Sequence, residues 1–143
     1  MSEALEGHVG ELVEIADRET ALGGQRLTAE VARAAGQLRF YADVAGEGSF
    51  LDVTIDDATG TTPRLVRVNR PIGPVAVFGA SNFPFAFGLL GNDTGSAIAA
   101  GCPVIAKAHP AHVLLSERLA ELAMAALASS ARAGGHVRHG RWV

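Results

Sequence analysis

The chain has 143 residues, close to the size of one domain, and its 48% hydrophobic and 19% charged residues indicate a globular protein. A formal net charge of −3 gives no field that would attract nucleic acid or an anionic membrane, and the one cysteine excludes an intramolecular disulfide. The apolar stretch 83–100 is interrupted by Asn92 and Asp93, and no N-terminal stretch has the pattern of a secretory signal. We therefore expect a cytoplasmic protein without nucleic-acid or membrane partners.

Two amphipathic helices are predicted within residues 1–49. Apolar residues recur at helical spacing from residue 9 to residue 22, where Gly23 and Gly24 end the pattern. A second apolar stripe predicts a helix that Thr28 caps and that ends near Val44. We expect the two helices to pack against each other.

A β-hairpin is predicted within residues 50–70, where the apolar period changes to two. Alternating apolar residues flank the turn-forming segment 57–63, namely Leu51, Val53 and Ile55 before it and Val66 and Val68 after it. Acidic residues on the first strand and arginines on the second favour cross-strand pairs, each worth about 0.2–1 kcal/mol. The hairpin is either a local surface feature or a contact in an oligomer, because an unpaired edge favours association.

Residues 71–131 predict a parallel strand–helix–strand unit followed by a last helix, and hence an α/β fold. The strands are Val75 to Phe78 and Val104 to Ala106, and a helix is expected between them after Pro84. Gly88, Gly91 and Gly95 would let a neighbouring backbone approach that helix closely, and Gly101 would end it. The last helix is expected from about 114 to 131, and the basic segment 132–143 is expected to be a disordered tail.

Asn82 and Lys107 follow the two predicted strands, at the sheet edge where open α/β folds bind ligands. Asn82 either caps the following helix or donates from its amide to a developing oxyanion at that helix N-terminus. Lys107 is either a solvated strand end or a donor to the hydroxyls or phosphates of a nucleotide. These residues alone leave both pairs of alternatives open.

The other reactive side chains favour structural roles. Cys102 lies among apolar neighbours without an activating base, so we expect a buried thiol rather than the nucleophile of a thiol hydrolase. The spacing of His109 and His112 is repeated by His136 and His139 without cysteine or carboxylate partners nearby. Both pairs are expected in solvated loops, and no metal site is predicted.

The segments RPIGPVAVF (70–78), GASNFP (79–84) and CPVIAKAHP (102–110) resemble the aldehyde dehydrogenase superfamily, in particular its ketoglutarate-semialdehyde and fatty-aldehyde (NADP-dependent) branch. The resemblance covers roughly residues 11–131. It implies that residues 1–131 form a partial NAD(P)-binding, Rossmann-like domain with a protruding hairpin. In that family the corresponding hairpin, here 50–70, belongs to the oligomerisation element, so a homo-oligomer is expected.

The resemblance also implies roles for individual residues. Asn82 would form the oxyanion hole, and Lys107 would contact the adenosine ribose of NAD(P). The remaining cofactor-binding candidates are Phe78, Gly79, Ala80, Ser81, His109 and Pro110. Many NAD-preferring members carry a glutamate where this chain has Pro110, so we expect NADP to be tolerated. Ala80 and Ser81 replace the family's usual Pro-Trp, a departure that suits the named branch.

The implied reaction oxidises an aldehyde to a carboxylic acid with NAD(P)+. The family's nucleophilic cysteine and general-base glutamate match no residue of this sequence. We therefore expect no turnover by this polypeptide alone. The sequence leaves open whether the chain is a real product, a gene fragment or a frameshift product. The alternative is a non-catalytic interaction or oligomerisation remnant of such an enzyme.

Overall fold

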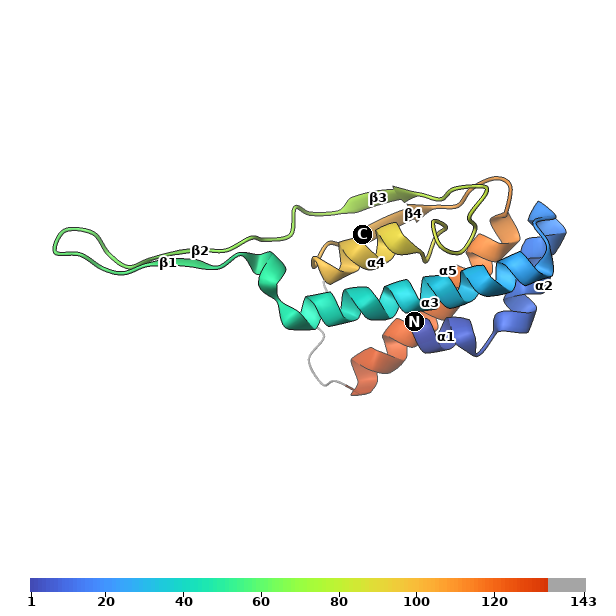
Figure 1. The fold of residues 1–143 in the computed structure, drawn as a ribbon, viewed down its shortest axis with the longest axis horizontal. Coiled ribbons are helices and arrows are strands. Elements are labelled where there is room, and N and C mark those ends of the chain that lie inside the picture. Colours follow the sequence, from blue (N-terminus) through green and yellow to red (C-terminus); the bar gives the residue numbers. More distant parts are fainter. Residues whose placement is uncertain (134–143) are drawn as a thin grey trace.

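A body of helices carries a narrow β-arm and a small parallel sheet (Figure 1). This computed structural model describes residues 1–133. The elements, in chain order, are α1 (Ser2–Glu6), α2 (Val9–Thr20), α3 (Gly24–Glu47), the short 3-10 helix η1 (Ser49–Leu51), β1 (Thr54–Asp56), β2 (Leu65–Arg67), β3 (Val75–Phe78), α4 (Asn92–Ala99), β4 (Val104–Lys107) and α5 (Val113–Ala133).

The hydrophobic core lies among α1, α2, α3 and α5, where their apolar faces meet. Its fully buried large side chains include Leu5, Leu12, Leu27, Val31, Phe85, Leu90, Leu115 and Leu119. The predicted helices 9–22 and 28–44 are therefore confirmed in type and in the face that they bury. Burial of this apolar surface is the main force that holds the helices together.

Two predicted helix ends differ in the structure. The first helix stops at Thr20 because Ala21 adopts a left-handed conformation (φ 52°) and the Asp17 carboxylate accepts the N–H of Gly23. The second helix already begins at Gly24, so the prediction that Thr28 is its cap is wrong. The Thr28 hydroxyl instead donates to the Gly24 carbonyl inside the helix, 2.8 Å away.

Strands β3 and β4 are parallel, and α4 lies between this two-stranded sheet and α3 (Figure 1). Their register pairs Val75 with Val104 and Phe78 with Lys107. The predicted strand–helix–strand unit is thus present, and both strands end at one edge. Gly95 lets α4 approach α3, since a Cβ there would lie 3.2 Å from Leu38 and Tyr41 side-chain atoms.

The prediction of a continuous helix after Pro84 is wrong. Residues 84–91 form turns, and α4 begins only at Asn92. The turns bring the chain so close to itself that a Cβ on Gly91 would lie 2.4 Å from the Ala86 carbonyl oxygen, and Glu30 of α3 accepts the N–H groups of Phe85 and Ala86. Gly91 therefore serves a tight reversal of the chain rather than the approach of a neighbouring helix.

The hairpin projects from the body as an arm (Figure 1). β1 and β2 are antiparallel, with Ile55 opposite Val66, as the alternating pattern predicts. Among the expected cross-strand ion pairs, the described residues contain one, Arg67 with Asp52 at 3.7 Å, and both side chains are exposed. Such a pair contributes little, so the arm by itself has few interactions that stabilise it.

Helix α5 starts and ends close to the predicted bounds of 114 and 131. Most of the predicted tail, 132–143, lies outside the described residues, as do His136 and His139. None of the helices within residues 1–133 has the length and apolar character needed to cross a bilayer.

Candidate functional site

The predicted site residues gather around the carboxyl edge of β3 and β4. Phe78 and Lys107 are the last residues of the two strands and lie opposite each other in the register. The Gly79 N–H donates to the Lys107 carbonyl oxygen at 3.3 Å, which extends the pairing by one step. The loop with Asn82 and the loop with His109 and Pro110 therefore both leave the sheet at this edge.

Asn82 lies on the exposed rim of this edge. Its backbone carbonyl accepts a hydrogen bond from Arg26 of α3. Within residues 1–133 its side-chain amide has no hydrogen-bond partner and caps no helix, so the capping interpretation is wrong. The expected helix N-terminus at Asn82 is also absent, since only one turn follows, in which Phe87 N–H donates to Phe83 O. The amide remains available as a donor.

The loop between β3 and Asn82 is fixed through its backbone. Ala80 N–H donates to the Phe87 carbonyl at 2.9 Å, so the loop pairs with the turn segment 84–91. Phe78 is 70% exposed and Ser81 is also exposed. The apolar ring and the hydroxyl are thus accessible while the backbone between them is held.

Lys107 and the residues after it form the second side of the edge. The Lys107 ammonium is exposed, and its one hydrogen bond within residues 1–133 goes to the neighbouring Ala108 carbonyl at 3.1 Å. His109 Nδ1 accepts the N–H of Ala111 at 3.1 Å, and Pro110 is exposed. This side of the edge therefore offers the Lys107 ammonium and has no carboxylate at position 110.

His112 is a residue that the sequence analysis placed wrongly in a solvated loop. Its ring is fully buried, lies 5.5 Å from the His109 ring, and joins the Ala80 carbonyl through Nε2 at 2.9 Å. A carbonyl only accepts, so we assign the proton to Nε2. Nδ1 lies 3.2 Å from the Ser116 hydroxyl oxygen, and that hydroxyl donates to the His112 carbonyl at 2.9 Å. The ring thereby connects the β3 loop to the start of α5.

A set of four polar side chains, the α3 polar stripe, follows the chain from Asn82 to Asn92. The stripe consists of Arg26, Glu30, Arg33 and Gln37, which share one helix face. Arg26 contacts Asn82 and Phe83, Glu30 binds the N–H groups of Phe85 and Ala86, Arg33 lies over the Phe87 ring, and Gln37 donates to Asn92. Apolar periodicity does not reveal this stripe, although its spacing of i, i+4, i+7 and i+11 places four polar side chains on one helix face.

Glu30 is the buried member of the stripe, with 5% of its surface exposed. Its Oε1 accepts from Phe85 N–H at 2.8 Å and from Ala86 N–H at 3.0 Å, whereas its Oε2 is buried without a partner in the described residues. A carboxylate that accepts two backbone N–H groups forms strong, charge-assisted hydrogen bonds. Glu30 therefore fixes the turn that directly follows Asn82.

A second carboxylate, Glu19 of α2, stabilises the start of α5. Its two oxygens accept the N–H groups of Leu114 and Leu115, each at 2.9 Å. These N–H groups have no partner within their own helix, and they carry its positive dipole end. The contact orients α5 directly after the loop that contains His109.

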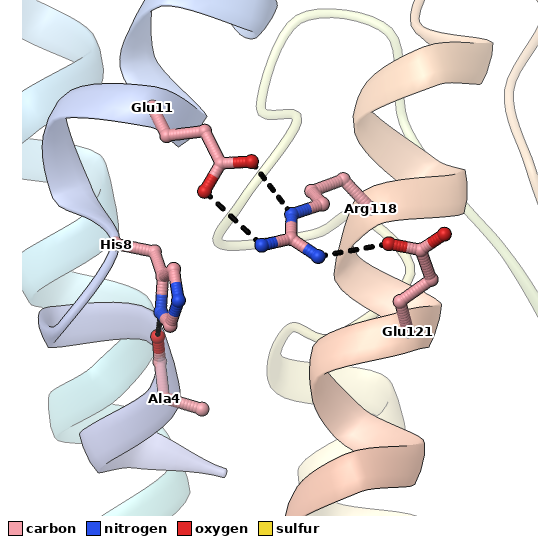
Figure 2. Close-up of polar contacts among 5 residues, drawn as sticks. All are labelled: Ala4, His8, Glu11, Arg118 and Glu121. Atoms are coloured by element: carbon pink, nitrogen blue, oxygen red, sulfur yellow. Dashed lines mark hydrogen bonds and ion pairs between the residues drawn. The ribbon is translucent and has the colours of Figure 1, made fainter.

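Helices α2 and α5 are also joined by the ion cluster in Figure 2. Arg118 donates through Nε to Glu11 at 2.7 Å and through Nη1 to Glu121 at 2.8 Å. The hydrogen bond from Arg118 is the main cause that lowers the pKa of Glu11, and the bond to Glu11 is the main cause that raises the pKa of Arg118. The cluster lies outside the candidate site and supports the helices that carry it.

Cys102 is buried and lies two residues before β4, as expected for a structural thiol. Its location between α4 and β4 supplies no activating base, which argues against a thiol hydrolase. Residues 1–133 contain no cluster of three or more metal-ligating side chains.

The chain is similar to known proteins in sequence and in fold. A family model described as "Aldehyde dehydrogenase family" matches residues 1–130. The chain is 48% identical over 131 residues to alpha-ketoglutaric semialdehyde dehydrogenase 2 of Azospirillum brasilense, covering 87% of this chain and 25% of that protein. It is 44% identical over 124 residues to alpha-ketoglutaric semialdehyde dehydrogenase of Acinetobacter baylyi, covering 83% and 24%. The chain thus spans about a quarter of the length of these relatives.

Solved structures share the fold. An E. coli NADP dependent enzyme superimposes with a TM-score of 0.73 at 25% identity, over 87% of this chain and 25% of that one. HpcC from Thermus thermophilus gives a TM-score of 0.67 at 27% identity, over 87% and 23%.

Proposed function

Because the chain belongs to the aldehyde dehydrogenase family, we propose that it supplies the oxyanion donor and part of the dinucleotide site of an enzyme that oxidises aldehydes to carboxylic acids. The observation that carries this proposal is the parallel register of β3 and β4, which brings the Asn82 loop and Lys107 to one edge. The names of the curated relatives favour a semialdehyde as the substrate.

Asn82 has the properties that an oxyanion donor needs. Its amide is exposed and lacks a partner within residues 1–133, while its backbone is held by Arg26 and the turn after it by Glu30. A fixed donor aimed at the aldehyde oxygen stabilises the negative charge that develops there during nucleophilic attack. Loss of one such donor costs about 100- to 1000-fold in kcat.

The residues at the edge fit a dinucleotide. The exposed Lys107 ammonium can donate to ribose hydroxyls, and the exposed Phe78 ring offers apolar surface beside it. When bound, NAD(P)+ accepts the hydride that leaves the substrate carbon. This chain contributes binding and orientation to that reaction.

The proposed dinucleotide site is tested on the 143-residue chain by NMR titration with NADP+. We expect shifts at the amides of Gly79 and Ala80, and we expect Lys107→Met to weaken binding at least tenfold. Asn82→Ala is the matched control, since it removes an amide from the same edge and should leave cofactor affinity unchanged. If Lys107→Met bound NADP+ as tightly as the wild type, Lys107 would have no part in cofactor binding.

We further propose that NADP+ is accepted as well as NAD+. Pro110 places no carboxylate where one would repel the 2′-phosphate, and His109 lies beside it. Comparable dissociation constants for the two cofactors, with Pro110→Glu selectively weakening NADP+, would support this. A strong preference of the wild-type loop for NAD+ would refute it.

The second candidate function is association through the hairpin, residues 50–70. The specific observation in its favour is that Val53, Ile55, Leu65 and Val66 are each about half exposed on an arm with few internal contacts. We propose that this arm pairs with another copy or with a complete enzyme. A strictly monomeric chain without affinity for such an enzyme in size-exclusion chromatography would exclude this function.

A further inference from the structure

Two members of the α3 polar stripe form a cationic and aromatic patch directly after Asn82. The Arg26 guanidinium carbon lies 5.1 Å from the centre of the Phe83 ring, and that of Arg33 lies 5.3 Å from the centre of the Phe87 ring. The two rings meet edge to face with centres 5.7 Å apart. The two cations and the two rings are therefore parts of one continuous surface.

Neither arginine of this patch forms an ion pair with a carboxylate in the described part of the chain. Other helix arginines pair with carboxylates, namely Arg18 with Glu14, Arg39 with Glu6 and Arg118 with Glu11. In contrast, Arg33 makes no hydrogen bond or ion pair within residues 1–133, and Arg26 bonds to the Asn82 carbonyl. Glu30 lies between them in sequence, but its Oε1 is used by backbone N–H groups.

The chemistry of the patch suits a carboxylate. Both arginines are exposed, and stacking on a ring leaves the donor edge of a guanidinium directed away from the ring face. Such an edge forms paired hydrogen bonds with the two oxygens of a carboxylate. Arg26 is also tied to the Asn82 backbone, so the patch and the oxyanion donor are held in one local structure.

We propose that Arg33, with Arg26 beside it, binds the carboxylate of an aldehyde substrate that carries an acid group at its far end. This inference rests on the proposed function and deepens it by assigning the residues that recognise the acid group of such a substrate. The aldehyde oxygen lies at the Asn82 amide, the carbon chain crosses the Phe83 and Phe87 rings, and the acid reaches the guanidinium groups. Arg33 acts as a specificity-determining residue.

The first test measures carboxylate binding by the chain itself. The Nε–Hε NMR signals of the arginines are followed during titration with succinate and, separately, with neutral butyramide. We expect saturable shifts of the Arg26 and Arg33 signals with succinate alone, and their loss in Arg33→Gln but not in the control Arg18→Gln. Equal shifts at Arg18, no shifts, or a stronger response to adenosine 2′-phosphate would overturn the proposal.

The second test measures specificity in a complete enzyme. Residues 1–131 replace the matching segment of alpha-ketoglutaric semialdehyde dehydrogenase 2, and oxidation of succinic semialdehyde is compared with that of butanal. Arg33→Gln should lower kcat/KM for the acid aldehyde roughly 10- to 100-fold, mainly through KM, and change butanal oxidation less than about twofold. Equal effects on both aldehydes would overturn the subsite. A hybrid enzyme that oxidises neither aldehyde would count against the proposed function. The NMR titration with succinate would then still show whether Arg26 and Arg33 bind a carboxylate.

Discussion

Glu30 holds the turn after Asn82 through two buried hydrogen bonds, so a single side chain of α3 controls the loop that carries the proposed oxyanion donor. We expect Glu30→Ala to lower the free energy of unfolding by about 3 kcal/mol, because two buried N–H groups lose their acceptor. Glu30→Gln keeps an acceptor oxygen and should cost less. Urea unfolding followed by circular dichroism measures both.

Glu14→Ala is the matched control for this residue, since Glu14 is exposed and pairs with Arg18 one turn away. Its removal should change stability by less than about 0.5 kcal/mol. If Glu30→Ala were as stable as this control, Glu30 would have no part in holding the loop.

At the scale of elements, the contact between α2 and α5 depends on the ion cluster of Figure 2. Arg118 lowers the pKa of Glu11 below its ordinary value of 4.5 in the folded state. A carboxylate with a depressed folded pKa stabilises the fold above its unfolded pKa, and this contribution is lost as pH falls through the folded pKa. The stability advantage of the wild type over Glu11→Gln should therefore shrink below about pH 4.5.

Unfolding midpoints in urea, measured from about pH 7 to about pH 3, give this difference directly. Glu117→Gln is a suitable control, because Glu117 is exposed on α5 and makes no ion pair in residues 1–133. An advantage over Glu11→Gln that grew on acidification would contradict the assignment of the cluster.

Helices and strands whose apolar residues recur at a regular spacing could be predicted from the sequence, whereas the turns of residues 84–91 could not. The apolar stripes of α2, α3 and α5 and the alternation of β1 and β2 each reflect burial of one face, which sequence spacing records. Residues 84–91 have apolar and small side chains that also suit a helix. Their turns depend on the Glu30 carboxylate of α3, which accepts the N–H groups of Phe85 and Ala86 and which no local pattern shows.

At the scale of the whole molecule, the hairpin arm and the outer face of β3 and β4 leave apolar side chains exposed, Phe78 and Ile105 among them. An isolated two-stranded arm is marginal in water, so we expect it to gain stability by association. Val66→Lys should weaken self-association of the chain, measured by sedimentation velocity, by placing a charge in the paired strands.

Met124→Lys is the control for this prediction, because Met124 is 66% exposed on α5, outside the arm. It should leave association unchanged. Equal weakening by both variants would mean that the arm has no specific role in assembly.

Short-range spacing and side-chain polarity specify the type and order of most elements, the burial of Cys102, and the placement of Asn82 and Lys107 after two strands, so these features could be predicted from the sequence. How the loops are held depends instead on contacts between segments that are distant in the chain. Glu30, His112 and Glu19 bind backbone groups 32 to 96 residues away in the chain. Such a partner is chosen by packing in three dimensions, and a polar residue on a helix or in a loop carries no local sign of it.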